Sequence, residues 1–75
     1  MNKYNDWENL LSLANEDLKA YGYEILVEES ISGCYDCEIL KDGVAVENYA
    51  QNYYWDELEE LVTDAWHYVS NKINR

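Results

Sequence analysis

The stretch CYDCEILKDGVAVENY, residues 34 to 49, places an Asp-Gly pair between two runs of strand-forming residues. A two-residue hairpin turn of type I′ needs a positive φ at both central positions, and Asp-Gly is one of the pairs that provide it most readily. The stretch therefore predicts two antiparallel strands, about 35–40 and about 44–49, that are joined at Asp42 and Gly43.

A third strand is predicted on the N-terminal side of this hairpin. Residues 23–28 alternate in polarity, with Tyr23, Ile25 and Val27 on one face, and this is the period of a half-buried strand. A turn over residues 30–33 joins it to the hairpin, so the three strands are expected to form one antiparallel sheet.

Apolar residues at helical spacing predict a helix on each side of the three strands. The first helix is expected over about 6–21, with Asn5 as its cap and Gly22 as its stop. The second is expected over about 53–73, with Asn52 as its cap. The apolar positions are Trp7, Leu10, Leu11, Ala14, Leu18 and Tyr21 in the first helix, and Leu58, Leu61, Val62, Ala65, Val69 and Ile73 in the second.

A chain of 75 residues predicts a single domain, residues 1–75. The expected fold class is α+β, in the order α-β-β-β-α, with a three-stranded antiparallel sheet and two helices on one face. A domain of this length buries only roughly 60% of the surface of its unfolded chain. Its stability is therefore small, and any added staple matters.

The charge of the chain is strongly one-sided, with 16 acids against 5 bases and a formal net charge of −11. Such a field repels nucleic acid and anionic membranes and attracts basic protein surfaces. We therefore expect a basic protein surface as the partner, with no direct nucleic-acid contact and no membrane contact. The first residues do not have the pattern of a signal peptide, and the two cysteines suit a reducing compartment, so a cytoplasmic location is expected.

Two acidic patches are the candidate partner-binding surfaces. Strand alternation predicts one on the sheet face away from the helices, and the other lies at the start of the second predicted helix. Each has a plain alternative explanation, because a sheet face can simply be solvated and a helix start favours acids through its dipole. The sheet patch comprises Glu24, Glu28, Asp36, Glu38 and Glu47, with Leu26, Leu40, Ala45 and Tyr49 on the same face; the helix patch comprises Asp56, Glu57, Glu59, Glu60 and Asp64, with exposed Tyr53 and Tyr54.

Both cysteines of the chain, Cys34 and Cys37, stand three positions apart. If the segment is a plain strand, Cys37 faces the core with Tyr35 and Ile39, and Cys34 faces outward. Residues three apart in a strand are separated by roughly 10 Å, whereas a disulfide needs Cα atoms within about 7 Å. No disulfide is expected in that case, and the buried cysteine acts as a small apolar residue.

The alternative is a turn before the strand that brings Cys34 and Cys37 to one structural Zn²⁺. C-x₂-C is a zinc-ligand spacing, and carboxylates can complete the coordination. Asp36, Asp6 and Asp56 are the candidate carboxylate ligands. The sequence leaves the plain strand and the zinc site both open.

Enzymatic activity is not expected. His67 is the only histidine, which is a thin basis for acid–base catalysis. The three glycines form no phosphate-binding loop. No residue is therefore named as catalytic.

The order α-β-β-β-α at this length resembles the double-stranded RNA-binding domain. That family presents a lysine-rich start to its last helix, where this chain reads YYWDELEE, residues 53 to 60. Because phosphate contacts dominate nucleic-acid affinity, this departure from the family predicts that the chain does not bind RNA.

The size, acidity and element order of the whole chain also resemble small, strongly acidic phage anti-CRISPR proteins that inhibit type II RNA-guided nucleases. This resemblance implies a non-enzymatic inhibitor that binds a basic, nucleic-acid-handling surface of a type II CRISPR effector nuclease and blocks DNA loading. It also implies a location in the cytoplasm of a cell that hosts a phage or mobile element. Two alternatives stay open: a small zinc-binding regulatory protein-interaction domain, and a DNA mimic that acts on restriction enzymes or histone-like proteins.

Overall fold

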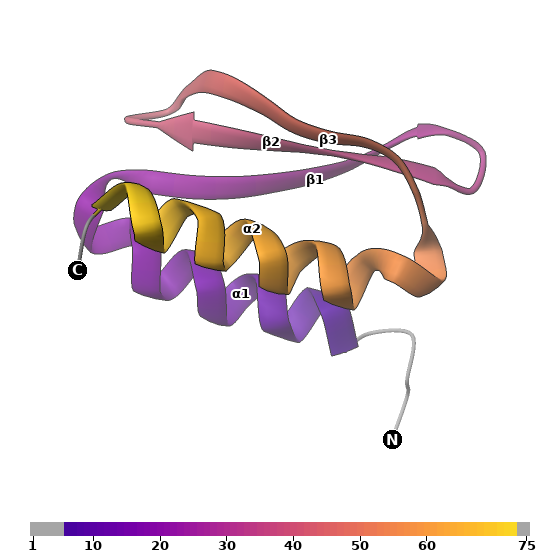
Figure 1. The fold of residues 1–75 in the computed structure, drawn as a ribbon, viewed down its shortest axis with the longest axis horizontal. Coiled ribbons are helices and arrows are strands. Elements are labelled where there is room, and N and C mark those ends of the chain that lie inside the picture. The colour runs from indigo at the N-terminus through magenta and orange to yellow at the C-terminus, as the bar shows by residue number, and fades with distance from the viewer. Residues whose placement is uncertain (1–5, 74–75) are drawn as a thin grey trace.

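The structure is a computed structural model that describes residues 6–73. Its elements follow the order α-β-β-β-α, so the predicted α+β fold class is confirmed (Figure 1). The proposed cap at Asn5 lies outside the described residues. The elements are α1 (Asp6–Leu18), the 3₁₀ helix η2 (Lys19–Tyr21), β1 (Tyr23–Ile31), β2 (Cys34–Lys41), β3 (Val44–Tyr54), the 3₁₀ helix η3 (Trp55–Glu57) and α2 (Leu58–Ile73).

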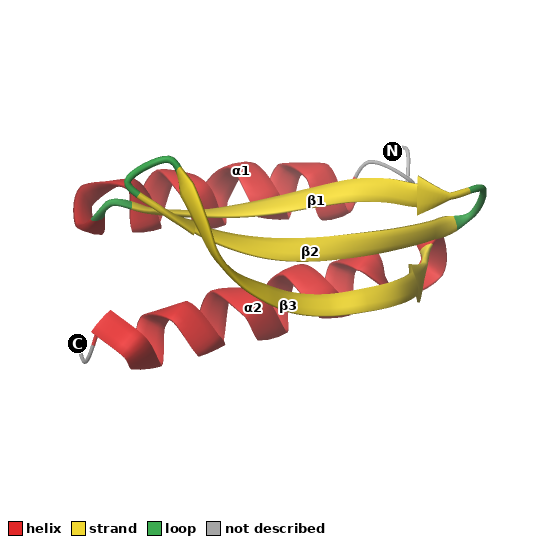
Figure 2. Ribbon diagram, turned by 90° about the horizontal axis from the view of Figure 1, so that it is seen from above, coloured by secondary structure: helices red, strands yellow, loops and turns green. Residues whose placement is uncertain are grey.

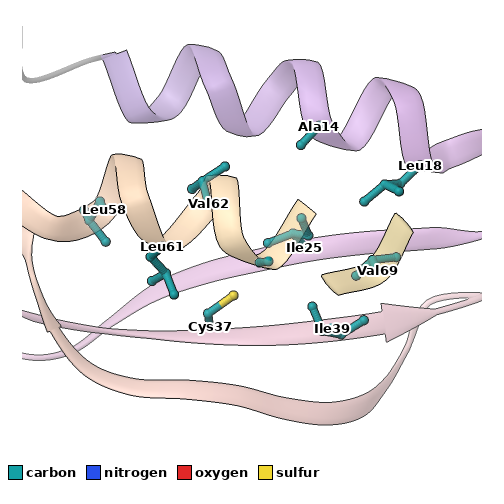
Figure 3. Close-up of a cluster of buried hydrophobic side chains, with 10 residues drawn as sticks. Ala14, Leu18, Ile25, Cys37, Ile39, Leu58, Leu61, Val62 and Val69 are labelled. Carbon is teal, nitrogen blue, oxygen red and sulfur yellow. The ribbon is translucent and has the colours of Figure 1, made fainter. Parts of the chain in front are cut away.

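The molecule has two layers, a three-stranded antiparallel sheet in the order β1-β2-β3 and a pair of helices on one of its faces (Figures 1 and 2). The core fills the space between these layers, as Figure 3 shows. Burying these apolar side chains is the main favourable term in folding. The fully buried side chains are Ala14 and Leu18 of α1, Ile25, Cys37 and Ile39 of the sheet, and Leu58, Leu61, Val62, Ala65 and Val69 of α2.

The two helices run in the same direction. Each strand reverses the direction of the chain, and three strands separate α1 from α2, so the starts of both helices lie at one end of the molecule (Figures 1 and 2). A hydrogen bond of 2.8 Å from Trp66 Nε1 to Asp17 Oδ2 joins the two helices.

Both turns that the sequence predicted from glycine are present. Asp42 and Gly43 have φ values of 53° and 83°, as the predicted Asp-Gly hairpin requires. Gly22, with φ 81°, ends the first helical segment and donates its backbone N–H to Lys19 O at 3.0 Å. The positive φ of Gly22 is a backbone conformation that residues with a β-carbon rarely adopt, so this stop favours glycine.

The second helical segment starts later than predicted, with the 3₁₀ helix η3 at Trp55 and the regular helix α2 at Leu58, and the predicted cap at Asn52 is wrong. β3 continues to Tyr54, and Asn52 lies within it in a left-handed conformation with φ 63°. Asparagine tolerates this conformation better than most residues, and its backbone N–H donates to Asp36 Oδ1 at 3.2 Å. The helical segment begins after Tyr54, whose N–H donates to Glu57 Oε1 at 3.0 Å.

The outer edge of β1 is closed by a side chain of α1. Asn15 Nδ2 donates to Ile25 O at 3.0 Å, and Ile25 N–H donates to Asn15 Oδ1 at 2.7 Å. The amide thus reproduces the two hydrogen bonds of a neighbouring strand. It fixes α1 against the sheet and leaves this part of the edge unavailable for pairing with another chain.

Substituting Asn15→Ala is expected to lower the free energy of unfolding by about 1–3 kcal/mol, because it leaves a backbone donor and acceptor unpaired beside the core. Asn9→Ala, at an exposed position of the same helix, is the matched control and should change stability by no more than about 0.5 kcal/mol. Urea denaturation followed by circular dichroism measures both. Equal effects of the two substitutions would show that the amide does not hold the edge.

Candidate functional site

The candidate site is the face of the sheet that points away from the helices, here called the outer face. Figure 2 views the molecule from this side, with both helices behind the strands. Strand pairing arranges the outer face in four rows that run across the sheet. From one end to the other, the rows are Glu24–Leu40–Ala45, Leu26–Glu38–Asn48, Glu28–Asp36, and Ile31–Cys34–Tyr54.

The third row places two carboxylates directly opposite each other. Glu28 on β1 is the register partner of Asp36 on β2, and like charges in this arrangement are destabilising. Together with Glu38 they line an open hollow of 280 Å³, whose other lining residues are Glu29, Ser30 and Asn48. The outer face therefore concentrates negative charge at a cost to the fold.

Asp36 also has a structural role in this row. Its Oδ1 accepts a hydrogen bond from Ser30 Oγ at 3.4 Å and from the backbone N–H of Asn52 at 3.2 Å. One carboxylate oxygen on the central strand thus contacts both edge strands.

The structure corrects the prediction that Glu47 and Tyr49 lie on the outer face. Glu47 is the register partner of Ile39, which is a core residue, so it lies on the helix side of the sheet. The pairing of β2 with β3 is irregular at three places, and each β-bulge shifts the alternation by one residue. Simple alternation along the sequence therefore assigned these two residues to the wrong face.

On the helix side, Glu47 joins β3 to α2. It accepts a hydrogen bond from the hydroxyl of Tyr68, and Lys72 Nζ lies 3.3 Å from its Oε1. The bond from Tyr68, followed by the contacts with Lys72, lowers the pKa of the Glu47 carboxyl from its ordinary value. The ring of Tyr49 packs on that of Tyr68, with centroids 4.9 Å apart. These contacts join β3 to α2 on the helix side of the sheet.

The acids predicted at the start of the second helix are exposed. The aromatic neighbours differ, because Tyr54 is 59% exposed while Tyr53 is half-buried and packs against the core. The prediction that Tyr53 is exposed was therefore wrong. The exposed acids of this patch are Asp56, Glu57, Glu59, Glu60 and Asp64.

The parallel helices divide the molecule into two ends of different charge. The starts of α1 and α2 and the β1–β2 turn lie at one end, here called the acidic end (Figures 1 and 2). The lysines of residues 6–73 are Lys19, Lys41 and Lys72, and all belong to segments at the other end. The acids at the acidic end are Asp6, Glu8, Glu28, Glu29, Asp36, Asp56, Glu57, Glu59 and Glu60.

Internal contacts hold two of these lysines on the helix side. Lys41 Nζ donates to Tyr21 O at 2.9 Å and lies 5.0 Å from the centroid of the Tyr23 ring. Lys72 pairs with Glu47. Within the part of the chain that the structure describes, the acidic end consequently has no lysine to offset its charge.

Both cysteines lie in β2, so the zinc hypothesis loses the turn on which it depended. Cys37 is buried and Cys34 is half-buried on the outer face, as the plain strand predicted. Burial, and then the charge of Glu38, raises the pKa of the Cys37 thiol to about 12, so without a bound metal this thiol is protonated at neutral pH. Among residues 6–73, no group of three or more His, Cys, Asp or Glu side chains is placed to hold a metal ion.

The last row of the outer face contains residues that the sequence did not identify as a site. Ile31 was expected in a turn, yet β1 extends to it and leaves it 66% exposed. Cys34 on β2 is the register partner of both Ile31 on β1 and Tyr54 on β3, and the residue after Tyr54, Trp55, is 55% exposed. The length of β1 could not be read from alternation, because Glu28, Glu29 and Ser30 interrupt the apolar pattern.

No helix within residues 6–73 is both long and apolar enough to cross a membrane. Comparisons with protein-family models, with curated proteins and with solved structures found no match to this chain.

Reversing one charge of the opposed pair should stabilise the protein. Glu28→Lys places an ammonium opposite Asp36 and is expected to raise the free energy of unfolding by about 0.5–1 kcal/mol at low ionic strength. Glu24→Lys changes the net charge equally, but its register partner is Leu40, so its effect should be smaller. Urea denaturation of both variants tests this, and a larger gain for Glu24→Lys would contradict the importance of the pair.

The buried Cys37 thiol predicts a dependence of stability on alkaline pH. Because its pKa is raised in the folded protein from 9.0 to about 12, the stabilisation is fully present below about pH 9 and declines as the pH rises toward the folded value. Cys37→Val should reduce the slope of unfolding free energy against pH between about 8.5 and 10. Cys34→Ser is the control and should retain the slope, so an equal reduction in both variants would contradict the prediction.

Proposed function

We propose that this protein is a non-enzymatic inhibitor that binds a basic, nucleic-acid-handling surface of another protein and blocks the loading of DNA onto it. The observation that supports this most is the arrangement of charge: the outer face and the acidic end collect carboxylates, while the lysines of residues 6–73 lie at the opposite end. A charge field of this kind steers the protein toward cationic surfaces.

The spacing of the carboxylates supports a phosphate-binding surface of the partner protein as the target. Acids two residues apart on a strand are separated by about 6.6 Å, and acids on adjacent strands by about 4.8 Å. Double-stranded DNA carries one charge per roughly 1.7 Å of its axis, so the outer face is less dense but of the same sign. A lysine- and arginine-lined channel can form charge-assisted hydrogen bonds with such carboxylates.

The first partner to test is a type II CRISPR effector nuclease. Its guide–target duplex lies in a positively charged channel, and the size, acidity and element order of the chain resemble anti-CRISPR proteins that act on such nucleases. Restriction enzymes and histone-like proteins offer basic surfaces of the same kind. Binding to one of these alone would make the protein a DNA mimic with a different target.

Charge reversal at the acidic end should weaken binding to the purified nuclease. Glu60→Lys, at the start of α2, is expected to reduce the affinity by roughly three- to tenfold at about 0.15 M salt, and the wild-type affinity should fall further at about 0.5 M. Glu16→Lys, an exposed position near the end of α1, changes the net charge equally and should have little effect. Biolayer interferometry measures all of these affinities.

Two outcomes of this experiment would contradict the proposal. Affinity that is the same at both salt concentrations would exclude electrostatic docking. Simultaneous binding of DNA and this protein, seen as a supershifted complex in a mobility-shift assay, would exclude inhibition of DNA loading even if the protein binds the nuclease.

A further inference from the structure

We propose that the row Ile31–Cys34–Tyr54, together with Trp55, is an apolar anchor site for a partner segment that presents an aromatic or aliphatic side chain flanked by lysine or arginine. The inference rests on the proposed function, because it assigns the contact residues and the chemistry of the partner within the same outer face. It adds an apolar contact that charge alone does not provide.

The apolar row crosses the whole sheet at its acidic end. Ile31 pairs with Cys34, and Cys34 pairs with Tyr54, so the three residues lie side by side on β1, β2 and β3. Ile31 is 66% exposed and Tyr54 is 59% exposed, and Trp55 follows at 55%. Their neighbours Tyr35 and Tyr53 pack against the core from the other face, whereas the side chains of Ile31 and Tyr54 lie mostly outside it. Tyrosine and tryptophan at such positions are typical of residues that dominate binding energy.

Carboxylates bracket this row on two sides. The adjacent row is the opposed pair Glu28 and Asp36, and the chain beyond Trp55 continues with Asp56 and Glu57, which are exposed. A neighbouring row is about 6.6 Å away, which is within reach of a lysine or arginine beside an anchored apolar side chain. An apolar centre with a charged rim is the usual anatomy of a protein interface.

The same charges disfavour a second copy of this chain as the occupant. Each copy carries a formal net charge of −11, and pairing two apolar rows would bring the carboxylates that bracket them together. A cationic partner is attracted by those carboxylates, whereas a second copy is repelled by them.

The anchor can be tested with synthetic peptides that do not depend on any particular partner. One probe is a short lysine-rich peptide with a single tryptophan, and the other replaces that tryptophan by serine at the same charge. The tryptophan peptide is expected to bind about tenfold more tightly and to shift the amide signals of Ile31, Cys34 and Tyr54 in ¹⁵N–¹H spectra. The same spectra show whether each variant is folded.

Matched variants locate the contact. Ile31→Ser and Tyr54→Ser should remove the difference between the two peptides. Val44→Ser and Val46→Ser should retain it, because these valines are 63% and 55% exposed but lie on the first part of β3, beside the Asp42–Gly43 turn.

Each other result overturns the anchor in a distinguishable way. Equal affinity for both peptides, or equal loss with the valine variants, would contradict a specific apolar contact while leaving salt-dependent binding to the nuclease, and with it the proposed function, intact. Self-association in sedimentation experiments that Ile31→Ser abolishes would identify the row as a dimer contact instead. Failure of both peptides to bind, together with failure of the nuclease, of restriction enzymes and of histone-like proteins, would remove the anchor and the proposed function together.

Discussion

One constraint determines the rest of this molecule. Three antiparallel strands separate the two helices in the sequence, and both helices pack on the same face of the sheet. An odd number of strands makes the helices parallel, and a two-layer arrangement leaves one sheet face without cover. The apolar burial is confined to the helix side, where Ile25, Cys37 and Ile39 contact the helices. Core packing therefore does not determine the side chains of the outer face, and contact with solvent or with a partner can.

The helix starts stabilise the acids of one acidic patch and not those of the other. Both helix starts, with their partial positive charge, lie at the acidic end, and each acid in a first turn gains about 0.3–1 kcal/mol there. Glu59 and Glu60 therefore have a structural reason to be acidic. The opposed pair Glu28 and Asp36 lies in the sheet and has no such compensation from a helix start. It is consequently the stronger indication of a surface shaped by a partner.

The parts of the structure that the sequence predicted depend on local signals. The Asp42–Gly43 turn, the stop at Gly22 and the apolar stripe of α2 follow from φ preferences and from helical period, and these need no knowledge of distant residues. The errors fall where distant contacts decide. Asn52 is held in a left-handed conformation by Asp36, sixteen positions away, and the bulges of β3 turn Glu47 toward Tyr68 and Lys72. For the candidate site, alternation found the acids of β1 and β2 but not the exposed row at Ile31.

Asp36 and Glu28 form one pair, yet they carry different information about function. Asp36 binds Ser30 and the backbone of Asn52, so it fixes the geometry of both edge strands near the apolar row. Any substitution there changes the fold and the surface together. Glu28 adds charge to the same surface, while its position in the register makes it a cost to stability. A domain of this size has little stability in reserve. Because Glu28 lowers that stability, its presence is the one that most needs a partner to explain it.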